Sequence, residues 1–393
     1  MKHLFITQDY APDLGGMARR HVELCRRLAG EGVLVSTVAA PGAEDFDRHE
    51  DYVIVRQPFS FSGARVLPNQ MRWAHWLEQA CTKGVDIVHC GNIRPAGYPV
   101  TWARARTGVP YLLYVNGGDL LREREKVARS RLKRMTGRMI FERAAGIVAN
   151  SDWTAAQAAD LMRQLGVTAP PPVRAIQLGT DPSFFRPDRD TGAVRQRFGL
   201  GDAPLLLTIA RLVPHKGQDV AIRALALLRA DWPSLRYLVV GAGPHELSLR
   251  LLARDLAVDD AVIFAGALGD DDIAEAYATA TIYLGLSRLE GTTVEGFGIS
   301  FSEAASSGLV AIAGDSGGVR SAVRDGETGM IVPAEDAPAV GAAIRSLLED
   351  LDRRRVMGAA ARQAVESHYN WDRVASETTA FAREVMRRPA AVP

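Results

Sequence analysis

Two glutamates in the C-terminal third of the chain carry its strongest chemical signal. Glu295 and Glu303 are separated by seven residues, and Gly296 and Gly298 lie just after the first of them. Glycine lets a ligand approach the backbone closely, and a helix N-terminus offers free N–H groups to an anion. Carboxylates on both sides of such a turn suit a ligand with hydroxyl groups at each end and phosphate in the middle. A nucleotide sugar is such a ligand.

Two other interpretations of these glutamates stay open on this evidence. Glu is favoured in the first turn of a solvated helix, where it meets the positive end of the helix dipole. A pair of carboxylates could also hydrolyse a glycosidic bond. The spacing disfavours hydrolysis, because residues eight apart with glycines between them do not point from one helix face at one bond.

Two cations in the same half of the chain suit the phosphate of such a ligand. Arg211 and Lys216 follow an apolar run at 204–210 and precede a segment with helical spacing at 218–228. Open α/β sheets bind ligands at the carboxyl ends of parallel strands. A diphosphate requires positive charge there, and arginine can hold phosphate oxygens with two hydrogen bonds. The alternative is an ordinary solvated loop.

The first half of the chain offers weaker candidates at the ends of predicted strands. Gly16 belongs to a Gly-Gly pair after the first apolar run, where the backbone could approach a phosphate or a sugar. Asn116 and Asp119 end the predicted strand at 111–115, and we expect Asp119 on the acceptor or membrane side. Asn, Gly and Asp are also ordinary turn residues, so turn formation explains both places as well. No GxGxxG follows the first strand, so a dinucleotide enzyme is not supported.

A strongly basic segment covers residues 122–143, where nine Lys and Arg alternate with apolar residues. This pattern predicts one basic amphipathic helix, which could lie on an anionic membrane or contact a phosphorylated acceptor. A solvated helix face is the alternative. The cations expected on the acceptor or membrane side are Arg129, Arg131, Lys133 and Arg134.

Composition is that of a globular protein with two or three domains. The chain has 393 residues, of which 47% are hydrophobic and 24% charged, and its net charge of +1 does not favour a nucleic-acid partner. Residues 1–187 nevertheless hold 25 Lys and Arg against 18 Asp and Glu. The three cysteines show no CxxC pair and no metal-ligand spacing, so we expect reduced thiols, a cytoplasmic location, and neither a metal nor a cofactor. There is no signal-peptide pattern and no apolar run long enough to span a bilayer.

Short apolar strands alternate with helical patterns along the chain, which predicts parallel sheets covered by helices on both faces. Two such cycles of similar length predict two doubly wound, Rossmann-like α/β domains that face a cleft. We place the first domain at 1–187 and the second at 192–371, with the boundary near 186–191. The terminal helix at 372–393 has no strand after it and is expected to pack back on the first domain.

Taken together, these motifs resemble the retaining nucleotide-sugar glycosyltransferases of glycosyltransferase family four, which have the GT-B fold. The resemblance covers nearly the whole chain, because several motifs occur in the family's order and spacing. The sequence around Ser287 is most similar to that of the branch that contains phosphatidylinositol mannoside mannosyltransferases. The matching motifs are Gly15-Gly16, Asn150-Ser151, Gly179-Thr-Asp181, Arg211 with Lys216, Glu295 with Glu303, and Gly317-Gly318.

The resemblance implies a role for each matching residue. Arg211 and Lys216 hold the diphosphate and its developing charge, Glu303 accepts hydrogen bonds from the ribose, and Glu295 contacts the sugar hydroxyls. Backbone N–H groups of Gly296, Phe297 and Gly298 support the sugar and phosphate. The family usually has histidine at the position of Asn116, beside the reacting sugar. Asparagine can form a hydrogen bond but cannot become cationic, so this position is a departure from the pattern.

The resemblance also implies an activity. The expected reaction moves a hexose, with retention and without a metal, from a GDP- or UDP-linked sugar to a hydroxyl of a glycan, a glycolipid or a small molecule. A lipid acceptor would place the protein at the inner face of the membrane. Two alternatives are a nucleotide-sugar epimerase on the same fold and, because of Asn116, a sugar-nucleotide-binding subunit with weakened catalysis.

Overall fold

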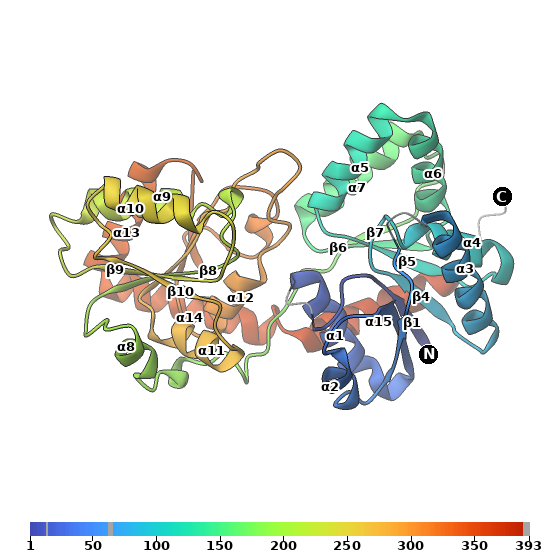
Figure 1. Ribbon diagram of the computed structural model, residues 1–393, viewed down its shortest axis with the longest axis horizontal. Coiled ribbons are helices and arrows are strands. Elements are labelled where there is room, and N and C mark those ends of the chain that lie inside the picture. Colours follow the sequence, from blue (N-terminus) through green and yellow to red (C-terminus); the bar gives the residue numbers. More distant parts are fainter. Residues whose placement is uncertain (13–14, 62–65, 388–393) are drawn as a thin grey trace. The chain divides into compact units, whose positions relative to one another are not determined.

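The computed structural model describes residues 1–12, 15–61 and 66–387, and it divides into two compact units (Figure 1). Unit 1 comprises Met1–Leu178 and the C-terminal segment from Trp371, and unit 2 comprises Gly179–Asn370. Each unit is a parallel sheet with helices on both faces, so the predicted α/β architecture is confirmed.

The sheet of unit 1 has the strand order β3-β2-β1-β4-β5-β6-β7 among the described residues, with every pairing parallel. β1 pairs with β2 on one side and with β4 on the other, so the strand order reverses between β1 and β4. Ligands of doubly wound sheets bind outside the carboxyl ends of strands at such a reversal. The strands are β1 (His3–Ile6), β2 (Val33–Val38), β3 (Val53–Gln57), β4 (Ile87–Cys90), β5 (Tyr111–Val115), β6 (Gly146–Ala149) and β7 (Val173–Ala175).

The core of unit 1 follows from the apolar runs of its strands. All five residues of β5 are fully buried, as expected for a strand covered by helices on both faces. One face is covered by α1 (Gly16–Leu28), α2 (Ala43–Arg48) and α15 (Trp371–Arg387) (Figure 1). The other face carries α3 (Val66–Thr82), α4 (Gly97–Thr107), α5 (Gly118–Arg129), α6 (Arg131–Glu142) and α7 (Asp152–Leu165).

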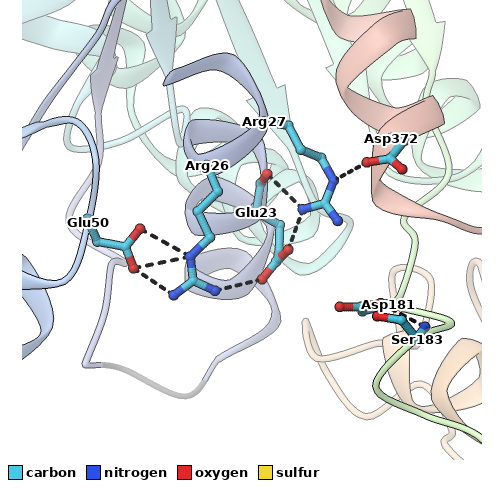
Figure 2. A network of polar contacts seen from close by, with 7 residues as sticks. All are labelled: Glu23, Arg26, Arg27, Glu50, Asp181, Ser183 and Asp372. Carbon is cyan, nitrogen blue, oxygen red and sulfur yellow. Dashed lines mark hydrogen bonds and ion pairs between the residues drawn. The ribbon is translucent and has the colours of Figure 1, made fainter. Parts of the chain in front are cut away.

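Helix α15 lies far from the rest of unit 1 in sequence but packs on β6 and α1. A Cβ atom on Gly146 of β6 would lie 2.7 Å from the ring of Phe381, so glycine at this position lets α15 approach the sheet. Ion pairs support the contact with α1, because Arg27 joins Glu23 of its own helix to Asp372, at 2.6 Å each (Figure 2). Residues 388–393 of the predicted terminal helix lie outside the described residues.

The sheet of unit 2 has the order β10-β9-β8-β11-β12-β13 in the described part of the chain, again with every pairing parallel. β8 pairs with β9 and β11, so the reversal of strand order falls between β8 and β11. The strands are β8 (Leu205–Ile209), β9 (Arg236–Val240), β10 (Val262–Gly266), β11 (Ile282–Gly285), β12 (Ala311–Gly314) and β13 (Gly329–Val332).

Helices also cover both faces of this second sheet (Figure 1). One layer contains α9 (Gln218–Leu228), α10 (Glu246–Asp255) and α13 (Ala337–Glu349). The other contains α11 (Asp270–Thr279), α12 (Ile299–Ser306) and α14 (Leu351–Ser367), and the short α8 (Ala193–Arg197) packs on α11.

By its packing the chain divides between Leu178 and Gly179, ahead of the domain boundary predicted near 186–191. Residues after this point already pack on unit 2. Phe185 is buried edge-to-face against Tyr277, with ring centroids 5.8 Å apart, and its carbonyl oxygen accepts hydrogen bonds from Ser306 and Arg362 at 2.8 Å. Phe185 precedes the predicted boundary in sequence but belongs to the core of unit 2.

The prediction of a single basic helix at 122–143 is wrong. The segment forms two helices, α5 and α6, that break at Ser130, whose backbone is extended (φ −146°, ψ 120°). The Ser130 hydroxyl accepts a hydrogen bond from the Lys133 N–H at 3.3 Å and so caps α6. Ser130 thus ends α5 and caps the N-terminus of α6.

Candidate functional site

The strongest candidate site lies where the strand order of unit 2 reverses. Lys216 ends a short 3-10 turn (Pro214–Lys216) after β8, and Glu295 lies in the loop after β11. The Lys216 Nζ and Glu295 Oε2 atoms are 2.6 Å apart, although the residues are separated by 79 positions. Their side chains remain 20% and 17% exposed, so a ligand can reach both. The structure therefore joins a predicted cation and a predicted carboxylate at the carboxyl end of the sheet.

The surroundings of Glu295 keep its carboxylate ionised. Burial alone would raise the pKa of Glu295, but the charge and hydrogen bond of Lys216 outweigh burial and lower it. The Ser287 hydroxyl also donates to Oε2, at 3.4 Å. An ionised carboxylate of this kind can accept hydrogen bonds from the hydroxyl groups of a sugar.

His215 lies beside this pair and is neutral near pH 7. Burial lowers its pKa to about 4, and the positive charge of Lys216 contributes further. Its carbonyl oxygen accepts the N–H of Arg288 at 2.8 Å, and the Arg288 guanidinium is paired with Asp219 at 2.9 Å. The loops after β8 and β11 are therefore connected through backbone as well as side chains.

Arg211 is placed in the same turn, just after β8, with its side chain exposed. Its carbonyl oxygen accepts a hydrogen bond from the Gln218 side chain at 3.1 Å, which ties this turn to the first residue of α9. Two cations thus follow one strand end within six positions, one exposed and one paired with Glu295.

Glu303 lies in α12 and is only 7% exposed. The Tyr277 hydroxyl donates to its Oε2 atom at 2.9 Å. Gly298 precedes α12 with φ +91°, and a Cβ atom there would lie 2.6 Å from the Phe301 ring, so only glycine fits this turn. The segment from Glu295 to Glu303 therefore forms a loop that leads directly into the N-terminus of α12.

Phe297 was predicted to contact the donor through its backbone N–H group, and its side chain lies in the core. Its side chain is buried, with a ring centroid 6.1 Å from that of Tyr369, and so it belongs to the core of unit 2. Gly296 is buried as well. Only the backbone at these two positions remains as a candidate for ligand contact.

A hollow of about 860 Å³ opens beside this site, lined by residues that follow β11, β12 and β13. Arg288 is part of its wall together with the acidic Asp315, Glu335 and Asp336. Because Arg288 also hydrogen-bonds to His215, the hollow adjoins the Lys216 turn.

The candidates of unit 1 gather around the start of α1 and the end of β5. Gly16 is exposed at the start of α1. The Asn116 side-chain amide donates to the sulfur of Met17 at 3.1 Å, so the strand-end loop touches the first turn of α1. The structure brings Gly16 and Asn116 to one edge of the unit 1 sheet.

Asp119 forms hydrogen bonds with the backbone of its own loop. Its Oδ1 atom accepts hydrogen bonds from the N–H groups of Asn116 and Leu120, both at 2.9 Å. The expected contact of Asp119 with an acceptor is therefore not available at this oxygen, which holds the turn that begins α5.

The four cations expected on the acceptor or membrane side differ in exposure. Arg129, Arg131 and Arg134 are exposed. Lys133 instead donates to the Tyr98 hydroxyl at 3.1 Å and is part-buried, so it does not belong to this surface.

Within the described ranges, no cluster of three or more His, Cys, Asp or Glu is arranged to hold a metal. No helix there combines the length and the hydrophobicity that crossing a membrane requires. The three cysteines are free and buried.

Two family descriptions match the chain, one in each half. "Glycosyltransferase Family 4" matches residues 14–184, and "Glycosyl transferases group 1" matches residues 191–364.

Full-length relatives extend this match. The GDP-mannose-dependent alpha-(1-6)-phosphatidylinositol monomannoside mannosyltransferase of Mycobacterium tuberculosis is 32% identical over 389 residues, which is 97% of each chain. The D-inositol 3-phosphate glycosyltransferase of Acidothermus cellulolyticus is 33% identical over 394 residues, covering 95% of this chain and 81% of the relative. The chain belongs to the group 1 glycosyltransferases and is an enzyme of that class.

Solved structures show the same fold. HepE from Anabaena, in complex with UDP and glucose, superposes with a TM-score of 0.77 at 19% identity, covering 97% of this chain and 98% of HepE. Sucrose-phosphate synthase from Thermosynechococcus elongatus gives a TM-score of 0.79 at 22% identity, covering 98% and 99%. The protein therefore has the GT-B fold.

Several residues around the site could not be singled out from sequence. Tyr277 and Ser287 are hydroxyl residues in apolar segments, and nothing in the pattern links them to Glu303 or Glu295.

Proposed function

We propose that the protein transfers a hexose from a nucleoside-diphosphate sugar to an acceptor hydroxyl, with retention of configuration at the sugar. The observation that supports this most is the Lys216–Glu295 pair of 2.6 Å at the β8–β11 reversal, with Arg211 in the same turn. This arrangement offers positive charge to a diphosphate and an ionised acceptor to sugar hydroxyls. GT-B fold and family membership are consistent with it.

In the proposed reaction, the acceptor oxygen bonds to the anomeric carbon on the face from which the diphosphate departs. The acceptor proton passes to the departing phosphate oxygen. Arg211 and Lys216 stabilise the charge that develops on this leaving group, an electrostatic role in a preorganised site. Glu295 orients the sugar, Glu303 binds the ribose, and the N–H groups of the 296–298 loop support the donor.

We infer GDP-mannose as the first donor to test. The relatives of Mycobacterium tuberculosis and Corynebacterium glutamicum are named as GDP-mannose-dependent, and both cover at least 94% of this chain. UDP-glucose is the second choice, since HepE is described in complex with it. An acceptor with an inositol phosphate group is proposed from the same relatives.

The test is a transfer assay with purified protein, each donor and inositol phosphate or phosphatidylinositol acceptors. Release of nucleoside diphosphate, product mass and the anomeric configuration by NMR are measured, with and without a chelator. Transfer with retention in the presence of chelator supports the proposal, including independence from metal. Donor binding without any transfer favours the weakened binding subunit, and conversion of the free donor favours an epimerase.

We further propose that a lipid acceptor is reached from an anionic membrane surface, at the cytoplasmic face. The supporting observation lies on the α5–α6 pair. Arg129, Arg131 and Arg134 are exposed there together with Leu132 and Met135, each 63% exposed. Exposed arginines next to exposed apolar side chains suit a surface that binds lipid headgroups and inserts between them.

A further inference from the structure

Two ion pairs cross the reversal of strand order in unit 2, and they run in opposite directions. Lys216, after β8, reaches Glu295 in the loop after β11, with Nζ and Oε2 2.6 Å apart. Arg288, after β11, reaches Asp219 in the first turn of α9, and its Nη1 atom lies 2.9 and 3.2 Å from the two carboxylate oxygens. Each side thus supplies the cation of one pair and the anion of the other.

The two pairs have different tasks in the proposed reaction. Lys216 is assigned to the diphosphate and Glu295 to the sugar hydroxyls, so a bound donor competes with the contact between them. The Arg288–Asp219 pair is assigned to no ligand and can persist while the donor is bound. A second pair of this kind keeps the two loops joined when the first pair turns to the donor.

The contacts of Arg288 lie on both sides of Lys216 in the sequence. The Arg288 N–H donates to the carbonyl oxygen of His215, one position before Lys216, at 2.8 Å. The Arg288 guanidinium binds Asp219, three positions after Lys216. One residue of the β11 loop therefore holds the turn that carries Lys216 at both of its ends.

The same turn lies directly against the end of β11. Gly217 has φ +73°, and a Cβ atom there would lie 2.0 Å from the carbonyl oxygen of Leu286. The Gln218 side chain donates to the carbonyl oxygen of Arg211 at 3.1 Å, which fixes the other side of the turn. A small shift of this backbone moves the Lys216 side chain, and misplacing a catalytic group by about 1 Å can lower a rate by about 100-fold.

The exposure of the Arg288–Asp219 pair separates its effect on activity from its effect on folding. The two side chains are 17% and 25% exposed. An ion pair that water reaches adds little to stability, because solvent screens it and two side chains must be ordered to form it. Loss of this pair should therefore change turnover more than it changes Tm.

We propose that Arg288 and Asp219 are positioning residues that act through Lys216. Their ion pair holds the turn after β8 against the loop after β11, so that Lys216 stays in place for the leaving diphosphate when the donor displaces its contact with Glu295. The inference rests on the proposed function, because it affects turnover only if Lys216 stabilises the leaving group.

A mutant cycle tests whether Arg288 acts through Lys216. In the transfer assay with GDP-mannose, Arg288→Gln should lower kcat by about 10–100-fold and change the donor KM less. In the Lys216→Ala background the same substitution should cost almost nothing further, because residues that act as one unit give losses that do not add. Equal fold-losses in both backgrounds overturn the proposal. If Arg288→Gln does not fold, Asp219→Ala takes its place in the cycle.

Asp219→Ala distinguishes positioning from direct contact between Arg288 and the ligand. It leaves Arg288 present without this partner, so it should lower kcat as much as Arg288→Gln does, and Arg288→Lys should recover most of the activity. A large loss in Arg288→Gln with normal kcat in Asp219→Ala makes Arg288 a ligand-binding residue and overturns the proposal. The matched control is Arg345→Gln, which breaks a 2.6 Å pair with Asp231 elsewhere in unit 2 and should leave kcat unchanged.

Calorimetric titration with GDP and UDP tests the same coupling without any transfer. A nucleoside diphosphate carries the charge of the leaving group in full, so Arg288→Gln should weaken its binding in the wild-type background and have little effect in Lys216→Ala. Such coupling in a wild type that transfers no sugar defeats the proposed function alone. Transfer with independent losses defeats the positioning role alone, and a wild type that binds neither GDP nor UDP defeats both.

Discussion

A Cβ atom on Gly317 would lie 2.3 Å from the carbonyl oxygen of Glu295. Gly317 has φ +58°, and the N–H of the next residue, Gly318, donates to that same oxygen at 2.9 Å. The turn after β12 thus closes directly on the backbone of Glu295. The position of this carboxylate depends on a glycine pair as well as on Lys216.

Gly317→Ala should therefore weaken both folding and donor binding. The methyl group would push the Glu295 backbone away, and a non-glycine residue in the left-handed region costs roughly 1–2 kcal/mol by itself. Gly326→Ala is the matched control, because Gly326 has φ +75° but open space around its Cβ position. Urea unfolding and donor KM are measured for both. Equal effects of the two substitutions would show that the close approach to Glu295 does not matter.

Arg211 and Lys216 should act mainly on turnover. If they stabilise charge on the leaving diphosphate, removing either one costs roughly 2.7–4 kcal/mol of transition-state stabilisation, which is about 10²–10³-fold in kcat. Arg223→Ala, an exposed arginine on α9, serves as the control for loss of charge. Steady-state kinetics of Arg211→Ala, Lys216→Ala and the double variant test this. A double variant with near-normal kcat would remove both residues from the mechanism.

Substitutions of Glu295 and Glu303 should weaken the binding of different ligands. Glu303→Gln should weaken binding of the nucleoside diphosphate and of the sugar nucleotide alike, because the ribose is common to both. Glu295→Gln should weaken the sugar nucleotide much more than the bare diphosphate. Calorimetric titration of both variants with both ligands checks the division of roles.

Tyr277→Phe provides a control for the position of the Glu303 carboxylate. This substitution removes the hydroxyl that donates to Oε2 and keeps the ring in the core. It should produce a smaller loss in the same direction as Glu303→Gln. If both glutamate variants weaken both ligands equally, the assignment of one to the sugar and one to the ribose is wrong.

Much of the fold could be predicted because parallel strands are apolar along their whole length. Residues 111–115 form such a run, and the structure shows them as the fully buried β5. The positions of Lys216 and Glu295 after strands of one sheet made them candidates for a common site. What the sequence could not supply is the strand order, which alone makes β8 and β11 neighbours.

The contacts that local pattern does not encode join distant positions, such as the Lys133 bond to Tyr98 and the packing of Phe185 on Tyr277. The Ser130 cap is local, because its hydroxyl accepts the N–H of Lys133 three positions later. A side chain that looks like part of a charged face, such as Lys133, is then redirected by one neighbour. Local propensity is weak compared with such tertiary contacts.

Buried histidines should make unit 1 sensitive to acid. Burial lowers the pKa of His21 to about 3, against 6.5 in the unfolded chain. A depressed pKa means that stability is present above pH 6.5 and is lost as the pH falls toward 3, at about 1.4 kcal/mol per pH unit for one such group. His21→Leu should therefore lose less stability than wild type between pH 7 and pH 5. Urea unfolding at pH 7 and pH 5 measures this loss of stability, with the exposed His75→Leu as the control. If His21→Leu lost as much stability as wild type between these pH values, the prediction would be wrong.

The exposed arginines of α5 and α6 should hold the protein on anionic bilayers. Arg129, Arg131 and Arg134 are exposed, and each Lys or Arg near an anionic surface contributes about 1 kcal/mol. Wild type should therefore sediment with phosphatidylserine vesicles at low salt, and binding should weaken at 1 M salt, where screening shortens to about 3 Å. A variant with these three residues changed to Glu should remain in solution.

The matched control changes three scattered, exposed arginines of unit 1 to Glu, namely Arg48, Arg72 and Arg163. It carries the same change in net charge, so a general electrostatic attraction would be lost in both variants. Binding that survives in the control and disappears in the α5–α6 variant places the contact on this helix pair. Equal loss in both variants assigns the attraction to the charge of the whole unit. Wild type that does not bind at low salt removes the membrane proposal, while the transferase proposal still rests on Arg211, Lys216 and the two glutamates.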